Sequence, residues 1–498
     1  MNWKKALSFE VSEPLLLLFI LAFLLRLPTL FEPYWYGDEG IYLTLGLAIR
    51  KGLTLYRDIH DNKPPLLYLI AALSGNQFWF RSILLFWNLI NVWLIYELGK
   101  LIFKRQLPAA VAGFLFILFS LLPEGNIANG EVFMIMPVTA GMLILCKVLN
   151  VKTQFRRGLG AKLKAYFLSG VLFSLGFLFK APAIFSFLAA LIFLAFFSKQ
   201  KKSSLLNTQF FILIAGFCFL PLLSFIFYWS HGALFQYWTA AFTQNAGYVS
   251  SWGGKWGSSL FSLSSGFTQR GLILTSLILI LFFLRRRLSW EFLLVSLWFF
   301  IDLFASLLSA RPYPHYLIQV APALALLATF VIGRRKILEK ILASAAIFLL
   351  IFSFIFYKFW RYPVWTYYAN FFRFAAGRES KEQYFAFFDK RVNNTYKLAG
   401  IVKKLTNQND NIFVWGNEPY LYALSERLPP GRYMVAYHII DFNGWQETTQ
   451  AIKKKRPTLI IRMKGEKQFS QLNQILSQEY LAVLELDGAK IFKRIDLK

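Results

Sequence analysis

The hydrophobic residues of this chain form long uninterrupted runs up to residue 357 and much shorter groups after it. A helix needs about 17 to 25 apolar residues to cross the hydrocarbon core of a bilayer. Runs of roughly that length cover 14–31, 80–99, 107–123, 132–149, 165–180, 181–198, 208–229, 269–284, 289–309, 315–332 and 337–357. The pattern predicts a polytopic α-helical membrane protein with about 11 transmembrane helices, whose least regular point is the junction at Lys180-Ala181-Pro182.

Basic residues gather in the short segments between these runs. Cytoplasmic loops of membrane proteins are enriched in Lys and Arg. With eleven spans and a cytoplasmic N-terminus, all of these segments fall on the cytoplasmic side; they are Lys4–Lys5, Lys100–Arg105, Lys152–Lys164, Lys199–Lys202, Arg285–Arg287 and Arg334–Lys336. We therefore expect the opposite, exported face to receive residues 31–80, 124–131, 230–268 and 311–315 and everything after Lys358.

The residues after Lys358 have the pattern of a small soluble α/β domain. Residues 411–416, 458–463 and 480–484 are typical of buried strands, and residues 485–494 contain an Asp-Gly turn signal that favours a hairpin. Residues 444–455 have helical spacing that ends before Pro457. A chain of this size can build its own core. The prediction is a transmembrane domain over 1–357 and an exported α/β globular domain over 358–498.

Composition supports membrane insertion and removes several other classes. The chain is 57% hydrophobic and only 16% charged, which is not the balance of a soluble enzyme. Its net charge of +28 would suggest nucleic acid in a soluble protein, but the basic residues stand between apolar runs, so orientation signals and attraction to anionic lipid are the better interpretation. Cys146 and Cys218 both lie inside apolar runs, which excludes a disulfide framework.

The loop between the first two predicted spans, residues 31–80, carries the most unusual polar residues. Asp38 and Glu39 follow the first apolar run directly, and acids beside a hydrocarbon core are costly and rarely incidental. Residues 41–51 and 66–73 have a helical, membrane-surface character that would hold these carboxylates near the lipid headgroups. The simpler alternative is that the acids cap the first of these helices, although one cap needs one carboxylate.

Several motifs together resemble the GT-C superfamily of integral membrane glycosyltransferases. They are Tyr36-Gly37-Asp38-Glu39-Gly40, Asp61-Asn62-Lys63-Pro64-Pro65-Leu66, the arginine Arg81 at the start of the next span, Arg311-Pro312-Tyr313-Pro314-His315-Tyr316 and Phe413-Val414-Trp415-Gly416. Within the superfamily the chain is most similar to the branch of protein O-mannosyltransferases, aminoarabinose transferases and bacterial RgtA/B/C/D-like enzymes. The resemblance runs nearly end to end, and its specific part is the first exported loop.

The resemblance implies a fold and a reaction. A sugar moves from a polyprenyl-phosphate carrier to a glycan, lipid or protein acceptor on the exported face of the plasma membrane, with inversion at the anomeric carbon. Asp38 matches the aspartate of the family's acidic pair and is expected to be the base or acceptor-orienting carboxylate. Glu39 is expected to position Asp38, bind a cation or hold the loop. Lys63 is expected to neutralise the departing phosphate, with snorkelling to the interface as its alternative.

Further candidates lie before later spans. Glu131 stands where many relatives carry a second exported acid, and it is expected to orient the acceptor, pair with Lys63 or join a metal site. Arg81 can reach the phosphate or pair with an acid, and Lys180 has the same two interpretations. His315 and Tyr316 can donate hydrogen bonds to phosphate, with Arg311 adding charge. For Tyr316 an interfacial aromatic belt is the competing interpretation.

The sequence contains no arrangement that demands a cofactor. The four histidines have no zinc-ligand spacing, and no Gly-rich phosphate loop is present, which argues against a nucleotide-sugar donor. We expect no required metal, although Asp38, Glu39 or Glu131 is compatible with a divalent cation. A lipid or saccharide transporter and a non-catalytic scaffold for envelope assembly are the alternative function classes. In the soluble tail we expect Trp415 to be a core residue.

Overall fold

The computed structural model describes residues 12–122, 124–149, 158–197, 204–245, 265–309, 311–333, 336–486 and 488–495. The chain divides into two compact units, each built from separate stretches of sequence. Unit 1 comprises Met1–Leu27, Leu84–Ser224 and Ala246–Tyr362, and unit 2 comprises Pro28–Ile83, Phe225–Asn245 and Pro363–Lys498. One boundary, at Tyr362, lies close to the predicted division at residue 357. The other stretches of unit 2 group the first loop and residues 225–245 with the C-terminal residues.

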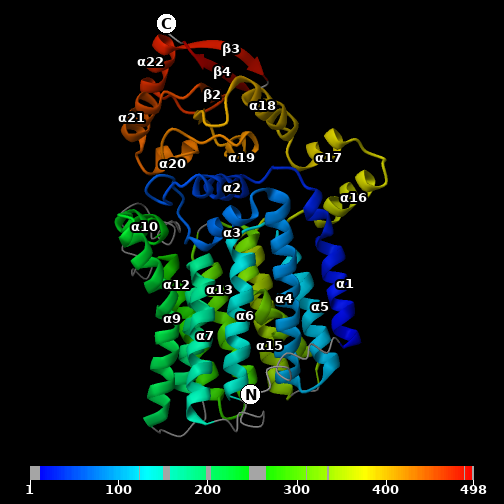
Figure 1. Ribbon diagram of the computed structural model, residues 1–498. Coiled ribbons are helices and arrows are strands. Elements are labelled where there is room, and N and C mark those ends of the chain that lie inside the picture. Colours follow the sequence, from blue (N-terminus) through cyan, green and yellow to red (C-terminus); the bar gives the residue numbers. More distant parts are fainter. Residues whose placement is uncertain are drawn as a thin grey trace. The chain divides into compact units, whose positions relative to one another are not determined.

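Helices occupy all eleven of the predicted apolar segments (Figure 1). Within the described residues, eight helices are long and apolar enough to cross a membrane, while α5, α8 and α13 are shorter. The polytopic helical architecture is therefore confirmed, and the number of crossings stays a prediction. The helices are α1 (Glu13–Arg26), α4 (Gln77–Phe103), α5 (Gln106–Leu121), α6 (Gly130–Leu149), α7 (Leu159–Phe179), α8 (Ala183–Ile192), α9 (Ser204–Ser230), α12 (Gly266–Leu284), α13 (Trp290–Ser306), α14 (Ala321–Ile332) and α15 (Ile337–Phe356).

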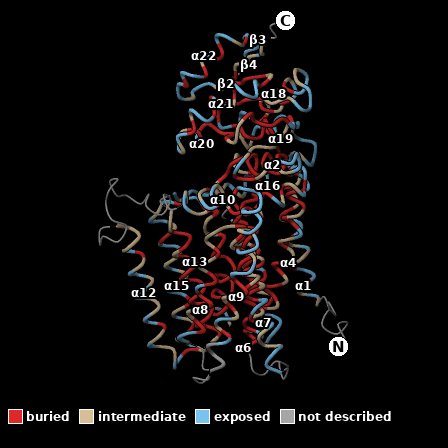
Figure 2. Tube along the Cα trace, turned by 60° about the vertical axis from the view of Figure 1, so that its left-hand side comes forward, coloured by how far each residue is buried: buried red, intermediate tan, exposed pale blue. Residues whose placement is uncertain are grey.

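The helices of unit 1 differ strongly in how far they are enclosed. Of the most apolar stretch of α6, 72% is buried, and the stretch formed by η5 (Pro314–Val320) and α14 reaches 78%, whereas α12 has only 11% (Figure 2). Helices α6 and α7 approach closely at small residues. There the Ser169 hydroxyl of α7 donates to the carbonyl of Gly141 of α6 at 2.8 Å. Small residues at such crossings let helix backbones approach closely. Unit 1 thus has a protein-enclosed centre and an apolar periphery.

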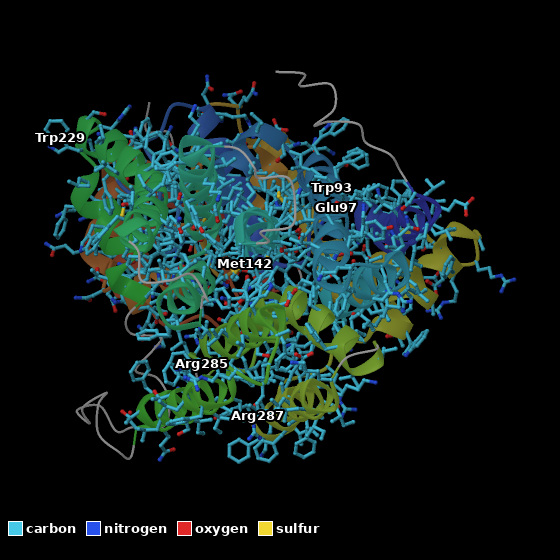
Figure 3. The ribbon with its side chains drawn as sticks, turned by 90° about the horizontal axis from the view of Figure 1, so that it is seen from below. Trp93, Glu97, Met142, Trp229, Arg285 and Arg287 are labelled. Atoms are coloured by element: carbon cyan, nitrogen blue, oxygen red, sulfur yellow. The ribbon has the colours of Figure 1, made fainter. Side chains whose placement is uncertain are left out.

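Successive helices of unit 1 alternate in direction, which gathers basic residues at one end (Figure 1). Arg285 and Arg287 lie at the end seen in Figure 3. There the Lys336 ammonium donates to the carbonyl of Arg287 at 2.9 Å, and the Glu339 carboxylate accepts from the backbone N–H of Ser289 at 2.8 Å. This grouping agrees with the distribution expected from the basic loops. Which end faces the cytoplasm stays a prediction.

The C-terminal part of unit 2 is an α/β fold, as the pattern predicts. A four-stranded sheet has the order β1-β2-β4-β3, in which β1 and β2 are parallel and the other pairs are antiparallel. Phe413 and Trp415 of β1 are buried in its core with residues such as Ile452 and Phe469, so Trp415 is a core residue. The strands are β1 (Ile412–Trp415), β2 (Leu459–Met463), β3 (Tyr480–Leu486) and β4 (Ala489–Arg494).

Short helices complete unit 2. Two of them, α2 and α3, lie in the first loop close to the predicted positions, and α2 carries the acidic pair Asp38 and Glu39. The bounds are α2 (Gly37–Arg50), α3 (Leu66–Ser74), α10 (Leu234–Ala241), α16 (Val364–Ala375), α17 (Lys381–Phe388), α18 (Val392–Leu405), α19 (Tyr420–Ser425), α20 (Ala436–Asp441), α21 (Trp445–Lys455) and α22 (Ser470–Glu479).

Helix α2 is enclosed by protein on several sides, which differs from a helix lying on the membrane surface with one wet face. Every residue from Glu39 to Ala48 is buried. One side packs on α3, where a Cβ at Gly46 would come within 2.6 Å of the Ala71 carbonyl carbon. Another side meets the residues that begin α19, since the Thr44 hydroxyl donates to the carbonyl of Pro419 at 3.0 Å. Amphipathic spacing alone cannot reveal a second covering surface 375 residues away in sequence.

The close approach of α2 and α3 predicts that Gly46→Ala destabilises the protein. The added methyl meets backbone atoms, which cannot rotate away, so we expect a loss of about 1–3 kcal/mol in the free energy of unfolding. Thermal unfolding of the detergent-solubilised full-length protein measures it. Gly400→Ala is the matched control, because no atom lies within 4 Å of its Cβ and alanine favours a helix. Equal stability of the two variants would contradict the close packing.

Candidate active site

The first turn of α2 separates the two adjacent acids. Tyr36 is the N-cap and its side chain makes no capping hydrogen bond, and both acids lie in the first turn of the helix. Adjacent residues of a helix point in directions about 100° apart. The Asp38 side chain is 36% exposed, whereas that of Glu39 is 2% exposed. The accessible acid is therefore Asp38.

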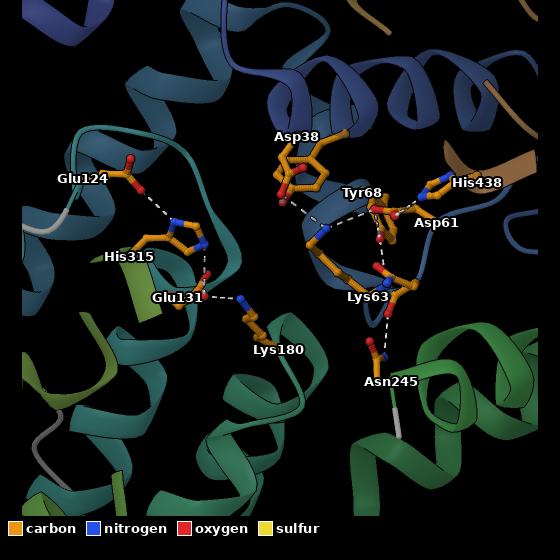
Figure 4. A network of polar contacts seen from close by, with 12 residues as sticks. Asp38, Asp61, Lys63, Tyr68, Glu124, Glu131, Lys180, Asn245, His315 and His438 are labelled. Atoms are coloured by element: carbon orange, nitrogen blue, oxygen red, sulfur yellow. Dashed lines mark hydrogen bonds and ion pairs between the residues drawn. The ribbon is translucent and has the colours of Figure 1, made fainter. Parts of the chain in front are cut away.

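Lys63 lies between two carboxylates of the first loop (Figure 4). Its ammonium is 3.6 Å from Asp38 Oδ2 and 3.4 Å from Asp61 Oδ2. The ammonium also stands over the ring of Tyr42, whose hydroxyl donates to Asp38 Oδ2 at 3.2 Å. The backbone of Lys63 is fixed as well, because the Tyr56 hydroxyl donates to its carbonyl at 2.7 Å. The prolines that follow and these contacts hold the lysine beside Asp38.

Asp61 is fully buried and holds Lys63 from the other side. The Tyr68 hydroxyl donates to Asp61 Oδ2 at 2.7 Å, and His438 Nε2 lies 3.6 Å from Asp61 Oδ1. Burial by itself raises the pKa of Asp61, but the Lys63 ammonium, His438 and the Tyr68 hydroxyl outweigh it and hold that pKa below its ordinary value. Asp61 is therefore ionised at neutral pH. One buried anion thus faces the lysine that also contacts Asp38.

Two buried tyrosines keep their protons in this cluster. Burial raises the pKa of Tyr42 well above its ordinary value, and the negative charges of Asp38 and Asp61 add to the rise. The pKa of Tyr68 is raised by burial and by Asp61. Both hydroxyls therefore act as donors to carboxylates. They orient the acids without competing for the proton of a substrate.

Glu39 and Arg81 form a buried charge network with Glu32. The Arg81 guanidinium contacts Glu39 through Nε at 2.9 Å and Nη2 at 2.5 Å, and it contacts Glu32 through Nη1 at 2.7 Å. The Tyr367 hydroxyl donates to Glu32 at 2.6 Å. Of the two interpretations open for Arg81, the structure favours pairing with acids. Glu39 is buried in this pair, and which of its expected roles it has stays a prediction.

Unit 1 contains a second polar cluster, which includes Glu131 at the start of α6 (Figure 4). Lys180, at the break between α7 and α8, forms an ion pair with Glu131. His315 of η5 forms a hydrogen bond between its Nδ1 and Glu124 Oε2 at 2.7 Å. Its Nε2 lies 4.0 Å from Glu131 Oε1. The irregular junction at residues 180–182 therefore places a lysine beside the predicted second acid.

The remaining predicted residues of unit 1 belong to η5 and to the loop before it. The Lys180 ammonium stands over the ring of Tyr316 at 4.8 Å from its centroid. His315 is buried, Tyr316 is half-buried, and Arg311 is exposed in the loop that precedes η5. The cluster thus combines a carboxylate pair, a lysine and an imidazole. Within the described part of the chain, no group of three His, Cys, Asp or Glu side chains has an arrangement that could hold a metal ion.

Sequence reasoning missed three members of these clusters. Asp61 stood in the quoted motif without a role, and its closeness to Lys63 follows only from the turn before α3. Glu124 lies in the loop before α6 with a left-handed backbone of φ 63°, and its contact with His315 spans 191 residues, which no local pattern reveals. His438 contacts the first loop from 377 residues further along the chain, a separation that local patterns cannot bridge.

The buried network predicts that Arg81→Met is severely destabilising. Removing the cation leaves Glu32 and Glu39 as buried anions, and breaking one partner of a buried pair costs about 3–5 kcal/mol. The yield of monodisperse protein after solubilisation and its melting temperature measure the effect. Arg57→Met is the control, since Arg57 pairs with Asp58 at the surface, and surface pairs contribute little. A stable Arg81→Met protein would contradict the network.

Two buried histidines of unit 2 predict that stability falls in mild acid. Burial lowers the pKa of His60 to about 3 and that of His438 to about 4. Between pH 6.5 and 4 the unfolded chain binds protons that the folded chain excludes, so the free energy of unfolding decreases as the pH falls. At pH 5 the loss is about 2 kcal/mol per histidine. Chemical unfolding at pH 7 and pH 5 measures it, and the double variant His60→Gln, His438→Gln should show a smaller difference. If the double variant lost as much free energy of unfolding between pH 7 and pH 5 as the unmodified protein, the two histidines would not be the cause.

Comparison with known families gives a partial sequence match. A profile of the dolichyl-phosphate-mannose-protein mannosyltransferase family matches residues 62–229, a range that contains Lys63, Arg81, Glu131 and Lys180. A comparison with the sequences of curated proteins finds no significant match.

Comparison with solved structures gives a match along nearly the whole chain. ArnT from Cupriavidus metallidurans bound to undecaprenyl phosphate is similar with a TM-score of 0.58 and 11% identity, over 97% of this chain and 98% of that chain. Its apo state gives a TM-score of 0.56 and 12% identity over 96% and 97%. AglB from Archaeoglobus fulgidus gives a TM-score of 0.47 and 10% identity, over 98% of this chain and 75% of that chain. Residues 62–229 are thus similar to that mannosyltransferase family, and the fold of nearly the whole chain is similar to that of ArnT.

Proposed function

We propose that the protein transfers a sugar from a polyprenyl-phosphate-linked donor to an acceptor on the exported face of the plasma membrane, with inversion at the anomeric carbon. The observation that carries the proposal is the pair formed by a partly exposed carboxylate, Asp38, and an ammonium 3.6 Å away, Lys63. Glycosyl transfer from a phosphate needs a base for the acceptor proton and a cation for the departing phosphate. The two groups meet both requirements.

The reaction is a single displacement at the anomeric carbon. The acceptor oxygen forms a bond to that carbon while the bond from the carbon to the phosphate oxygen breaks. Asp38 takes the acceptor proton, and its accessibility suits it for this role better than the buried Glu39. Tyr42 donates to the Asp38 carboxylate and orients it. The acceptor attacks the face opposite the leaving group, which inverts the configuration.

Lys63 stabilises the leaving phosphate. Its contacts with Asp38 and Asp61 hold the ammonium in place before a donor binds. A donor phosphate replaces part of this pairing and gains a positioned positive charge as its own charge develops. This role needs no metal ion, and we propose a metal-independent reaction. The solved ArnT structure bound to undecaprenyl phosphate supports a polyprenyl carrier.

The cluster of unit 1 has a secondary role in the proposal. Glu131, with its partner Lys180, is a second acid site for orienting the acceptor. His315, Tyr316 and Arg311 are proposed to donate hydrogen bonds or charge to phosphate groups. Glu39 and Arg81 are left out of the chemical step, because their side chains are buried in their mutual pair.

Asp38→Asn should abolish transfer while the protein still inserts and folds. The substitution keeps the shape of the side chain and removes the base, and general-base catalysis contributes about 10²–10⁴-fold to a rate. Purified full-length protein in vesicles is given a lipid extract that contains polyprenyl-phosphate-linked sugars, and mass spectrometry follows the released polyprenyl phosphate. Asp58→Asn, in the same loop but paired with Arg57 at the surface, is the control and should retain activity.

The same experiment separates the alternative functions. A scaffold is indifferent to Asp38→Asn, and a transporter moves the intact lipid-linked sugar across the vesicle membrane without releasing polyprenyl phosphate. Either result would contradict the proposal. Mass spectrometry of envelope glycans from cells with and without the protein then identifies the sugar and the acceptor, whether protein, lipid or glycan.

A further inference from the structure

A histidine from the C-terminal residues contacts the buried acid behind Lys63. His438 of α20 is 2% exposed, and its Nε2 lies 3.6 Å from Asp61 Oδ1 (Figure 4). Asp61 in turn contacts the Lys63 ammonium at 3.4 Å through its other oxygen. The three side chains form a continuous line from α20 to the lysine. All three belong to unit 2.

The surrounding contacts show that the C-terminal residues fix the first loop at several points. The backbone N–H of His60, next to Asp61, donates to the carbonyl of Arg432 at 2.9 Å. A Cβ at Gly40 would lie 2.8 Å from the backbone nitrogen of Tyr420, so α2 and α19 touch without a side chain between them. Residues 419–438 therefore meet both α2, which carries Asp38, and the turn that carries Lys63.

The chemistry of the His438 contact favours orientation over proton transfer. Burial lowers the pKa of His438 to about 4, so its ring is neutral at pH 7. A neutral ring can face a carboxylate oxygen favourably only through the N–H group of Nε2. Its Nδ1 has no hydrogen-bond partner among the described residues. With the N–H on Nε2, that group faces Asp61 Oδ1 at 3.6 Å, a polar contact longer than a hydrogen bond, while Tyr68 and Lys63 donate to Oδ2.

We propose that His438 is a positioning residue, which acts through Asp61 to hold the Lys63 ammonium beside Asp38. This inference rests on the proposed function, in which Lys63 binds the donor phosphate. It gives the C-terminal α/β region a role in the reaction, because α20 of that region supplies His438, which contacts Asp61. His438 itself touches neither Asp38 nor Lys63 in this arrangement, so it is not a catalytic residue.

The simpler explanation is that His438 only fills space among aromatic rings. Its ring lies 5.4 Å from that of His60 and 5.5 Å from that of Phe442. His438→Phe tests this explanation, because it keeps an aromatic ring and removes both nitrogens. His438→Gln keeps an N–H donor without the ring. Positioning predicts that Gln preserves function better than Phe, and space-filling predicts the reverse.

The first experiment measures binding of undecaprenyl phosphate to the purified full-length protein in detergent. We expect binding to be about tenfold weaker in His438→Phe, because this variant loses the polar contact with the charged Asp61. His438→Gln should stay within about threefold of the unmodified protein. Tyr437→Phe, which removes a polar atom from the neighbouring position of α20, should bind normally. Normal binding by a folded His438→Phe, with weakened binding by Lys63→Ala, would overturn the inference and leave the proposed function intact.

The second experiment needs no substrate and keeps the two proposals apart. An amine-reactive ester labels the lysines of the full-length protein, and mass spectrometry of peptides follows the rate at Lys63, with Lys51 of the same unit as internal reference. We expect Lys63 to label about threefold faster in His438→Phe, because Asp61 no longer has a fixed position. Faster labelling with unchanged undecaprenyl phosphate binding in every variant supports positioning and counts against the proposed function. An unchanged labelling rate in His438→Phe overturns the inference.

Discussion

The burial of the Arg81 guanidinium is the constraint on which the first loop depends. A buried cation needs partners that remove the cost of taking it out of water, and here two acids from the same loop supply them. Glu39 is one of these acids, and its neighbour Asp38 on the next position of α2 is turned toward solvent. The two adjacent acids therefore differ: Glu39 is a buried anion paired with Arg81, and Asp38 is accessible to a substrate.

Burial also explains how the lysine beside Asp38 is held in place. Asp61 is an anion with little exposure, and its environment of Tyr68, His438 and Lys63 keeps it charged. The charge on Asp61 in turn fixes the lysine by attraction. The same low accessibility makes each of these contacts stronger than it would be at the surface. A carboxylate and an ammonium can then stand together in a defined geometry before any substrate arrives.

Much of the architecture could be predicted from the sequence because its signals are local. Apolar length marks a helix of the bundle, a short apolar run marks β1, and an Asp-Gly turn signal marks the hairpin that contains β4, so these elements were predicted within a few residues of their bounds. The nearby members of the site, Asp38 and Lys63, belong to short motifs of one loop. The enclosure of α2 could not be predicted, because α19 covers it from a distant part of the chain.

The partners of the site residues were also beyond the reach of local patterns. Glu124 and His315 are 191 residues apart, and the contact between His438 and Asp61 spans a still longer interval. A carboxylate in a sequence gives its charge but not the side chain that neutralises it. Arg81 illustrates this, since a phosphate and a pair of acids are equally good partners for a guanidinium until the fold is known.

Unit 2 is assembled from three stretches, and the last of them begins at Pro363. During synthesis the ribosome releases residues 28–83 long before residues 419–438, which cover α2 and hold Asp61. The first loop is therefore made before the residues that cover it, and most of the apolar helices are synthesised in between. A chain truncated before residue 419 would lack the residues that cover α2 and contact Asp61.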